Sequence, residues 1–322
     1  MKVFFVTLLV FVCSVLCAQG LTSKESKLVY IMPPSAFDGK SFRDLFDYPD
    51  LWKNARGKID AIGYADHMLN RQFNDKELTR FFSLIGKWNK DFFLEVGAVK
   101  PWGMTGQEVF DAQKPMWDRF IKCGANISFI NLDEPLVCAK EHINKSFDYA
   151  VFETANFIEL VRKEYPNMKI GDVESYPGLS IEENLAWIDA LQAELNKRNV
   201  KGLDFYTIDM DWTHFILNTG GSMPGLKQIE LGCKERGIYF QLIYWAANYP
   251  ALKNIGFDED FIWYNGIMRQ GYDYALAGGD PDVYIIESWL DSPKKTVPDN
   301  KDFTFTKSVL DFCNRFLKKW SF

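Results

Sequence analysis

The sequence predicts a single (β/α)8 barrel, and three observations support this prediction. Eight short runs rich in β-branched and aromatic residues recur along the chain, and segments with helical apolar spacing separate most of them. This alternation favours right-handed β–α–β units and therefore a parallel sheet. No GxGxxG or GxxxxGK sequence follows any run, which removes the main support for a nucleotide-binding open sheet.

In the first half of the chain, four apolar runs end at polar or turn-forming residues, as strands do where they leave a core. The predicted strands are 27–33 (KLVYIMP), 59–68 (IDAIGYADHM), 92–99 (FFLEVGAV) and 127–135 (ISFINLDEP). Between them we predict a short helical or loop segment at 42–54 and helices at 75–88 and 107–122. Gly124 is expected to end the last of these helices near Cys123.

The second half repeats this plan. The predicted strands are 169–174, 203–212, 238–245 and 283–289, and the predicted helices are 147–165, 181–198, 226–236, 258–271 and 304–319. Ser180 is expected to cap the second of these helices, because Glu182 and Glu183 in its first turn suit the helix dipole. Gly237 is expected to end the third.

The first twenty residues resemble a secretory signal peptide. Lys2 precedes an apolar run over 3–16, and small or polar residues surround Ala18. We therefore expect a secreted protein with one domain over 21–322. No later run reaches the roughly 18 apolar residues that span a bilayer, so no stable membrane insertion is predicted.

Composition narrows the classes of partner. The chain is 47% hydrophobic, and its net charge of −6 argues against a nucleic-acid partner while allowing neutral or cationic small substrates. Four cysteines lie beyond the leader, and in an oxidising compartment they could form two disulfides or stay free; three pairings are open. They are Cys123, Cys138, Cys233 and Cys313. The oligomeric state is not predicted.

Acidic residues collect at the ends of the predicted strands, which in such a barrel meet on one face. Carboxylates pressed together raise one another's pKa and can supply a general acid and a base or nucleophile. Because strand side chains alternate, Asp172 should point the same way as Glu174, and Asp209 the same way as Asp211. The predicted catalytic residues are Glu134, Glu174, Asp209 and Asp211.

Aromatic residues lie beside these acids, and they favour a sugar ligand, whose C–H faces stack on rings while carboxylates bind its hydroxyl groups. Aromatic residues make up 16% of the chain. The predicted substrate-binding residues are Tyr64, Asp66, Glu95, Trp102, Asp133, Asp172, Tyr176, Trp212, Tyr244, Trp245, Glu287 and Trp289.

The sequence Asp133-Glu134-Pro135 resembles the fourth strand of the clan of retaining barrel glycoside hydrolases, which carries Asn-Glu-Pro there. The resemblance implies that Glu134 is the acid/base. The clan also keeps a nucleophilic glutamate on its seventh strand, but residues 238–249 contain no acid. The second carboxylate would then come from the fifth, sixth or eighth strand. Other barrel glycosidases pair acids from strands four and six, which favours Asp209 or Asp211.

The leading hypothesis is a secreted glycoside hydrolase that acts on a poly- or oligosaccharide without a cofactor. One alternative is a metal-dependent lyase, isomerase or hydrolase, with Mg²⁺ or Mn²⁺ held by oxygen ligands. Those ligands would be Glu134, Glu174, Asp209 and Glu287. A second alternative is a non-catalytic carbohydrate-binding barrel. A phosphodiesterase built on His67 and His214 is a minor alternative.

Overall fold

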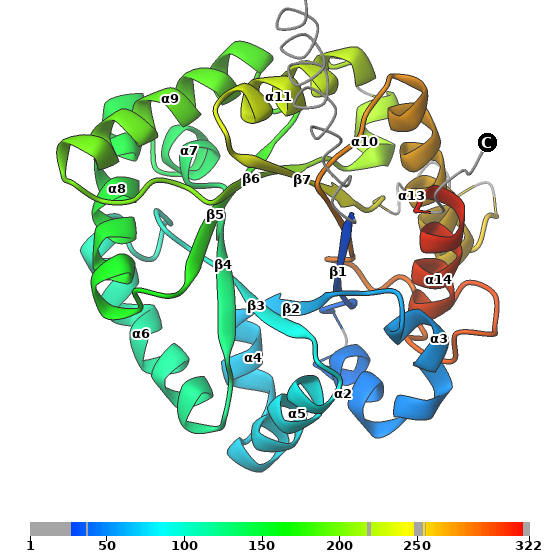
Figure 1. Cartoon of the computed structure of the whole chain (residues 1–322). Helices are drawn as coiled ribbons and strands as arrows, with labels where there is room; N and C mark the ends of the chain where they lie inside the picture. The colour runs from blue at the N-terminus through cyan, green and yellow to red at the C-terminus, as the bar shows by residue number, and fades with distance from the viewer. Residues whose placement is uncertain (1–26, 37, 218–219, 248–253, 255, 318–322) are drawn as a thin grey trace, which may run out of the picture.

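The centre of the molecule is a closed barrel of eight parallel strands, which confirms the predicted fold class (Figure 1). The computed structural model describes residues 27–36, 38–217, 220–247, 254 and 256–317. The strands are β1 (Leu28–Met32), β2 (Ala61–Ala65), β3 (Asp91–Val96), β4 (Ile127–Asp133), β5 (Lys169–Ser175), β6 (Phe205–Asp209), β7 (Tyr239–Tyr244) and β8 (Val283–Glu287). The expected signal peptide, residues 1–20, lies outside the described residues.

Helices surround the barrel (Figure 1). The outer helices are α2 (Lys40–Asp47), α5 (Asp75–Lys87), α6 (Gly106–Lys122), α8 (Phe147–Glu164), α9 (Ile181–Lys197), α11 (Met223–Glu235), α13 (Glu259–Leu276) and α14 (Phe305–Phe316). The segment predicted at 42–54 consists of α2, the 3-10 turn η1 (Pro49–Trp52) and α3 (Lys53–Arg56). No helix in the described part of the chain is both long enough and apolar enough to cross a membrane.

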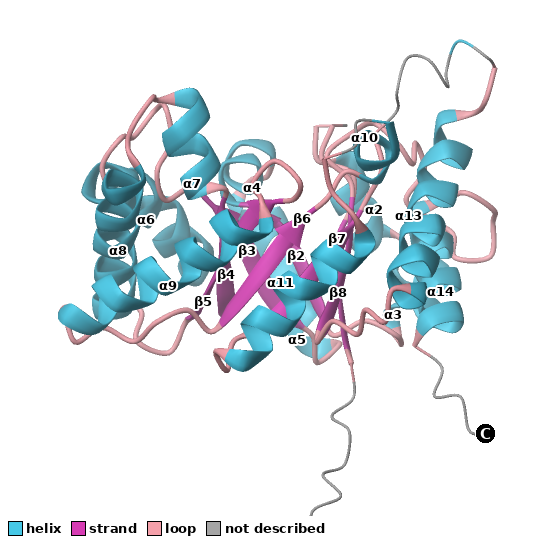
Figure 2. Ribbon diagram, turned by 90° about the horizontal axis from the view of Figure 1, so that it is seen from above, coloured by secondary structure: helices cyan, strands magenta, loops and turns pink. Residues whose placement is uncertain are grey.

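Short helices follow β2, β4 and β6 directly. They are α4 (Asp66–Gln72), α7 (Pro135–Val137) with the π-helical turn η2 (Cys138–His142), and α10 (Trp212–Leu217). Figure 2 shows α4, α7 and α10 at one end of the barrel, the end where the strands finish, which we call the mouth. The second and sixth strands were therefore predicted too long, because the chain turns into α4 at Asp66 and enters α10 at Trp212.

Side-chain caps fix where several helices begin. Asn74, Thr105 and Ser180 each accept a hydrogen bond from the backbone of the third helical residue, whose glutamate bonds back to the cap. The predicted cap at Ser180 is thus confirmed. Gly124 follows α6 with a φ of 95°, a conformation that suits a residue without a Cβ atom, so the predicted end of α6 is confirmed as well.

Alternate residues of each strand fill the barrel interior, and the others pack against the helices. Tyr30, Phe93, Phe129 and Phe205 form an aromatic layer inside the barrel. This layer requires glycine at position 171, because a Cβ atom there would lie 1.7 Å from the Phe205 ring. Inward positions nearer the strand ends are left for polar side chains.

The four cysteines of the barrel, Cys123, Cys138, Cys233 and Cys313, are buried and free. The sequence left open whether these cysteines form two disulfides or stay free, and in the structure they are free thiols. They lie at the end of α6, in η2, in α11 and in α14 respectively.

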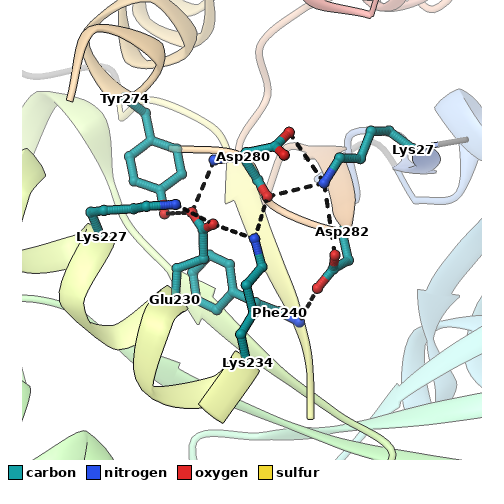
Figure 3. Close-up of polar contacts among 8 residues, drawn as sticks. All are labelled: Lys27, Lys227, Glu230, Lys234, Phe240, Tyr274, Asp280 and Asp282. Carbon is teal, nitrogen blue, oxygen red and sulfur yellow. Dashed lines mark hydrogen bonds and ion pairs between the residues drawn. The ribbon is translucent and has the colours of Figure 1, made fainter. Parts of the chain in front are cut away.

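The opposite end, where strands begin, is the base. Here Glu230 of α11 is 0% exposed and accepts four hydrogen bonds (Figure 3). The donors are the ammonium groups of Lys227 and Lys234, the Tyr274 hydroxyl and the backbone N–H of Asp280. Burial would raise the pKa of Glu230, but these donors outweigh it and lower the pKa.

The same cluster ties the first strand to the last. The Lys27 ammonium, just before β1, donates to the Asp280 carbonyl at 3.0 Å and lies 3.1 Å from the Asp280 carboxylate. Asp282 lies 3.7 Å from Lys27 and accepts a hydrogen bond from the Phe240 backbone (Figure 3). Polar groups at the base are thus paired within the protein.

Candidate active site

Four strands place a carboxylate at their last inward position. Glu95, Asp133, Asp209 and Glu287 continue the inward series that contains Phe93 on β3, Phe129 on β4, Phe205 on β6, and Val283 and Ile285 on β8. These side chains therefore meet at the mouth of the barrel. The prediction that acids at strand ends gather on one face holds for these four.

Glu134 follows β4 in an unusual backbone conformation. Its φ of 45° and ψ of 53° are left-handed, which is strained for a residue with a Cβ atom. Its backbone N–H donates to the Val173 carbonyl at 2.9 Å, and Pro135 then starts α7. The strained turn places Glu134 at the rim of the mouth rather than in the sheet.

The pKa of Glu134 is raised to about 7. Burial is the largest cause, the neighbouring Asp133 carboxylate adds to it, and the Lys100 ammonium opposes it. A carboxyl group with this pKa is about half protonated at pH 7, so it can supply a proton at neutral pH as a general acid must.

Asp209 lies across the same cleft, at the end of β6. Its pKa is raised to about 8: burial is the largest cause, the Glu134 carboxylate adds to it, and a hydrogen bond from the Trp245 indole opposes both. Since the negative charge of Glu134 contributes to this shift, Asp209 ionises more readily when Glu134 is protonated.

The cleft between these groups has a volume of about 630 Å³, within the range of small-ligand sites. Its lining residues are Glu134, Ser175, Tyr176, Pro177, Gly178, Asp209, Asp211, His214, Gly220 and Trp245. The Tyr176 hydroxyl donates to the Ser222 carbonyl and accepts from the Ser222 N–H, and so ties the cap of α11 to the cleft wall. The half-buried Trp245 supplies an aromatic wall.

Asp211 lines the cleft but is held by backbone groups. One of its carboxylate oxygens accepts hydrogen bonds from the Thr213 and Ala247 N–H groups at 3.0 and 2.9 Å. It thereby joins the start of α10 to the segment after β7. This position suits an anchor better than a reacting group.

Deeper in the mouth, burial raises the pKa of Glu95 and that of Glu287. Glu287 is 1% exposed, and neither of its oxygens accepts a hydrogen bond from a described residue; the Trp289 indole lowers its pKa without reaching hydrogen-bonding geometry. Asp133 adds to the pKa shift of both glutamates, so it lies close to each.

Lys100 is the functional residue that the sequence analysis missed. Its ammonium pairs with Asp133 and lies 3.3 Å from the Cys138 sulfur. Burial would lower its pKa, but these two partners raise it, so it stays charged. A lysine just past the third strand, in an otherwise apolar stretch, was the available signal.

Two predicted site acids on β5 lie outside the mouth, and this corrects the prediction. Val173 takes the inward position, so Asp172 and Glu174 point together toward the helices. Asp172 accepts a hydrogen bond from the Trp187 indole, and Glu174 accepts from the Leu136 N–H at 2.6 Å. The shared direction was expected correctly, but the face was not.

Three further predicted binding residues also lie on the helix side. Tyr64 donates its hydroxyl hydrogen bond to Gln72, Asp66 accepts from the Trp117 indole, and Tyr244 stacks on Tyr284. All three are buried in the shell between sheet and helices. They support the fold and do not contact the cleft.

The three remaining tryptophans border the mouth in different ways. Trp102 is 59% exposed, in the loop after β3, with its ring against Gly97. Trp212 is buried at the start of α10, stacked on Phe215, and lines a separate apolar groove. Trp289 is half-buried and packs on the barrel interior beside Glu287.

A larger cavity, of about 1000 Å³, lies at the base, where strands begin. Its carboxylates are engaged within the protein, as Asp204 is with Arg162 at 2.8 Å and Asp91 with the Ser128 hydroxyl at 2.7 Å. This face of such barrels serves stability, whereas reacting groups lie at the strand ends. We therefore place the site at the mouth.

The metal alternative has no support in the geometry. Within the described residues, no group of three or more histidine, cysteine, aspartate or glutamate side chains is arranged to hold a metal ion. Of the four ligands considered, Glu174 faces the helices and not the mouth. His214 lines the cleft, whereas His67 lies on α4 outside it, so the two histidines do not share this cleft.

Comparison with known proteins bears on the fold alone. No protein-family model matches the chain, and no curated protein sequence is significantly similar to it. A xylanase 10C variant from Cellvibrio japonicus, solved with xylopentaose, is 13% identical with a TM-score of 0.55; the match covers 86% of this chain and 61% of the xylanase. A GH10 endoxylanase from a sugarcane soil metagenome is 8% identical with a TM-score of 0.53, covering 89% and 97%.

The YdjI aldolase from Escherichia coli is 9% identical, with a TM-score of 0.48 over 90% of this chain and 89% of its own, too low a score to carry an argument. At these identities the similarity establishes architecture and not activity. The chain is a single eight-stranded parallel barrel, an architecture that it shares with GH10 xylanases.

Proposed function

We propose that this protein is a secreted glycoside hydrolase that cleaves O-glycosidic bonds of a poly- or oligosaccharide. The observation that carries the proposal is the pairing of Glu134 and Asp209 across one cleft, both with a pKa raised into the neutral range. Two carboxyl groups with tuned and coupled protonation are what glycoside hydrolysis requires. Export would depend on residues 1–20, which lie outside the described residues.

In this proposal Glu134 is the acid. Its carboxyl group, protonated near neutral pH because it is buried beside Asp133, gives a proton to the glycosidic oxygen as the bond to the sugar breaks. Asp133 is engaged instead in an ion pair with Lys100, which orients its carboxylate away from that role.

Asp209 is the second carboxylate. Because the pKa of Asp209, about 8, is higher than that of Glu134, about 7, a proton shared by the pair rests mostly on Asp209 in the free protein. The reacting form has this proton on Glu134; the charge of Glu134 then no longer raises the pKa of Asp209, and the ionised Asp209 acts as base or nucleophile. The Trp245 indole donates a hydrogen bond to it and fixes its orientation. The same tryptophan offers a ring face on which a sugar can stack. The acid missing from β7 is therefore replaced by one on β6.

The test is an assay of a broad panel of poly- and oligosaccharides, with products identified by mass spectrometry, for wild type, Glu134→Gln and Glu235→Gln. Glu235 is exposed near the end of α11, so the second variant removes the same charge far from the cleft. We expect fragments from wild type and Glu235→Gln and none from Glu134→Gln.

Fragments formed at an equal rate by a folded Glu134→Gln protein would remove Glu134 from the mechanism. A glycan that binds but is never cleaved would instead favour the carbohydrate-binding alternative, which needs the aromatic wall but no acid with a raised pKa.

A further inference from the structure

The proposed reaction does not use the cavity of about 1000 Å³ at the base, the end of the barrel opposite α4, α7 and α10 (Figure 2). Its volume is at the upper end of the range of small-ligand sites. Three rings of the aromatic layer line it from within the barrel: Tyr30, Phe129 and Phe205. The large apolar side chains that line it and are also exposed to solvent are Leu28, Ile121 and Tyr239. The cavity therefore combines an aromatic floor with an apolar rim.

Two buried polar side chains of this cavity lack protein partners, unlike those of the cluster around Glu230. Gln241 of β7 is 2% exposed; its Oε1 atom accepts a hydrogen bond from the Thr207 hydroxyl at 3.1 Å, but its NH2 group donates to no described residue. Tyr30 is 7% exposed, and its hydroxyl makes no hydrogen bond to a described residue. Buried polar groups are almost always bonded, so both groups are open to a ligand that displaces water from the cavity.

One strand carries both a free ring and a free donor. Tyr239 begins β7 and Gln241 follows two residues later, so their side chains point into the barrel in the series that continues with Ile243. The Tyr239 side chain is 54% exposed and contacts no other described aromatic ring. Only β8 separates β7 from β1, so Tyr30 approaches the same space. A ring stacked on Tyr239 would present its edge to the buried donors.

The charges of this cavity favour an uncharged ligand. Its three carboxylates all have partners in the protein: Asp204 has Arg162, Asp91 has the Ser128 hydroxyl, and Glu164 has the Lys114 ammonium at 2.9 Å. Lys169 also lines the cavity, but it is exposed, so water and salt screen its charge. Neither an anion nor a cation would find an uncompensated buried charge here.

We propose that this cavity is a second glycan-binding site, which stacks one sugar unit on Tyr239 and donates hydrogen bonds to it from Gln241 and Tyr30. A neutral pyranose has an apolar C–H face and an edge of hydroxyl oxygens that accept such bonds. The site binds without cleaving, because its carboxylates are engaged within the protein and cleavage needs a pair that is free to exchange protons. That the ligand is a glycan rests on the proposed function; that the site takes an uncharged ring rests on the cavity.

The experiment is isothermal titration calorimetry on residues 21–322 carrying Glu134→Gln, so that nothing is cleaved. The probes are cellotriose, xylotriose and the N-acetylglucosamine trimer, and phenol tests whether any aromatic alcohol suffices. We expect at least one trimer to bind at two sites, one of which Tyr239→Ala weakens about tenfold through loss of the stacking contact. Tyr239→Phe keeps the ring and should keep this site.

Gln241→Met removes the buried donor at a similar side-chain length and should weaken the same site. The matched control is Tyr48→Ala: Tyr48 lies between α2 and η1, is 52% exposed, and does not line the cavity. It should leave both sites unchanged, and melting curves establish that each variant is folded. The inference is overturned if no trimer shows a site that Tyr239→Ala weakens, or if phenol binds that site as tightly as the trimers do.

The two proposals fail separately. Trp245→Ala, at the mouth, should weaken the other site and leave this one unchanged. If binding that depends on Tyr239 is present but wild type cleaves no glycan, the base site stands and the hydrolase is wrong. If wild type cleaves glycans and Tyr239→Ala weakens the binding of no trimer, the base site is wrong and the hydrolase stands.

Discussion

Two buried glutamates, at opposite ends of one barrel, show how differently the fold treats the same side chain. Glu230 at the base accepts four hydrogen bonds, two of them from lysines, and its pKa is lowered. Glu287 at the mouth is equally buried, has no such donors, and its pKa is raised. Burial favours protonation in both, so the neighbours make the difference: four donors lower the pKa of Glu230, whereas the carboxylates of Asp209 and Asp133 raise that of Glu287.

This difference separates structural acids from candidate functional ones. At the base, each carboxylate is completed by the chain itself, and the cluster joins α11, α13 and the first and last strands (Figure 3). At the mouth five carboxylates gather; Lys100 pairs with Asp133 and opposes the rise in the pKa of Glu95 and Glu134, and neither oxygen of Glu287 accepts a hydrogen bond from a described residue. The predictions below test whether that division is real.

The largest effect should come from Glu134→Gln, which removes the proposed acid at the mouth and leaves the fold intact. We expect a loss of about 10²–10⁴-fold in kcat/KM, the usual contribution of a general acid, on any glycan that wild type cleaves. A pKa of about 7 leaves about half of the Glu134 carboxyl groups protonated at pH 7 and most of them at pH 6, so at pH 6 the neutral glutamine should leave the melting temperature nearly unchanged. A variant that melts early instead would show that Glu134 has the structural role assigned to Glu230.

The converse change is Glu230→Gln, which should cost about 2–3 kcal/mol of the free energy of unfolding at pH 7. It leaves two ammonium groups without their counter-charge, although Lys227 and Lys234 retain some contact with water. Chemical denaturation at several pH values measures this. The pKa of Glu230 is lowered in the folded state, so its stabilisation is present above its ordinary value of 4.5 and is lost in more acid solution.

The loss caused by Glu230→Gln should therefore shrink below about pH 4.5. Turnover of the folded variant should equal that of wild type, because Glu230 lies at the base. A drop in turnover without a drop in stability would contradict the division between the two ends.

Asp209→Asn should reveal the opposite pH dependence at the mouth. The pKa of Asp209 rises from 3.8 to about 8 on folding, so between these values the folded state holds a proton that the unfolded state has released. Stability contributed at this position therefore falls as pH rises through that window. Asparagine does not titrate, so wild type should lose stability relative to Asp209→Asn from about pH 4 to pH 8.

Thermal melting of both proteins across this range measures the difference, with Glu235→Gln as the control for loss of one charge. A difference that stays constant with pH would mean that Asp209 is ionised at all these values and is not the partner that shares a proton with Glu134.

Much of this fold could be predicted from the sequence, because the strands of a parallel barrel occur as short apolar runs between amphipathic helices. All eight strands were found, as were the cap at Ser180 and the stop at Gly124. The short helices α4 and α10 were missed, because they continue directly from strands and are too brief to show a period.

The candidate site was predictable only in part, for a physical reason. Period-two alternation showed that Asp172 and Glu174 share a face, but both faces of a barrel strand are buried, so the pattern cannot say which face points inward. Acids on β3, β4, β6 and β8 fell inward and those on β5 fell outward. That Lys100 pairs with Asp133 could not be predicted, because the loop after β3 brings Lys100 to the end of β4 only in the folded structure.

The smallest effect, and the finest test of the base, should come from Lys27→Met. The methionine keeps an aliphatic chain of similar length and removes an ammonium that lies 3.1 Å from the Asp280 carboxylate and 3.7 Å from that of Asp282. Asp280 can turn to water and Asp282 keeps the Phe240 N–H, so no carboxylate is left without a donor. The loss in the free energy of unfolding should then be about 0.5–1 kcal/mol, measured by urea denaturation.

This loss should shrink in roughly 0.5 M salt, because salt screens partly exposed ion pairs. The control is Lys76→Met, at an exposed position on α5, which should cost less free energy of unfolding at either salt concentration. A loss as large as that of Glu230→Gln would mean that Asp280 and Asp282 depend on Lys27 as Glu230 depends on its lysines, and that the base contains a second carboxylate site needing a cation.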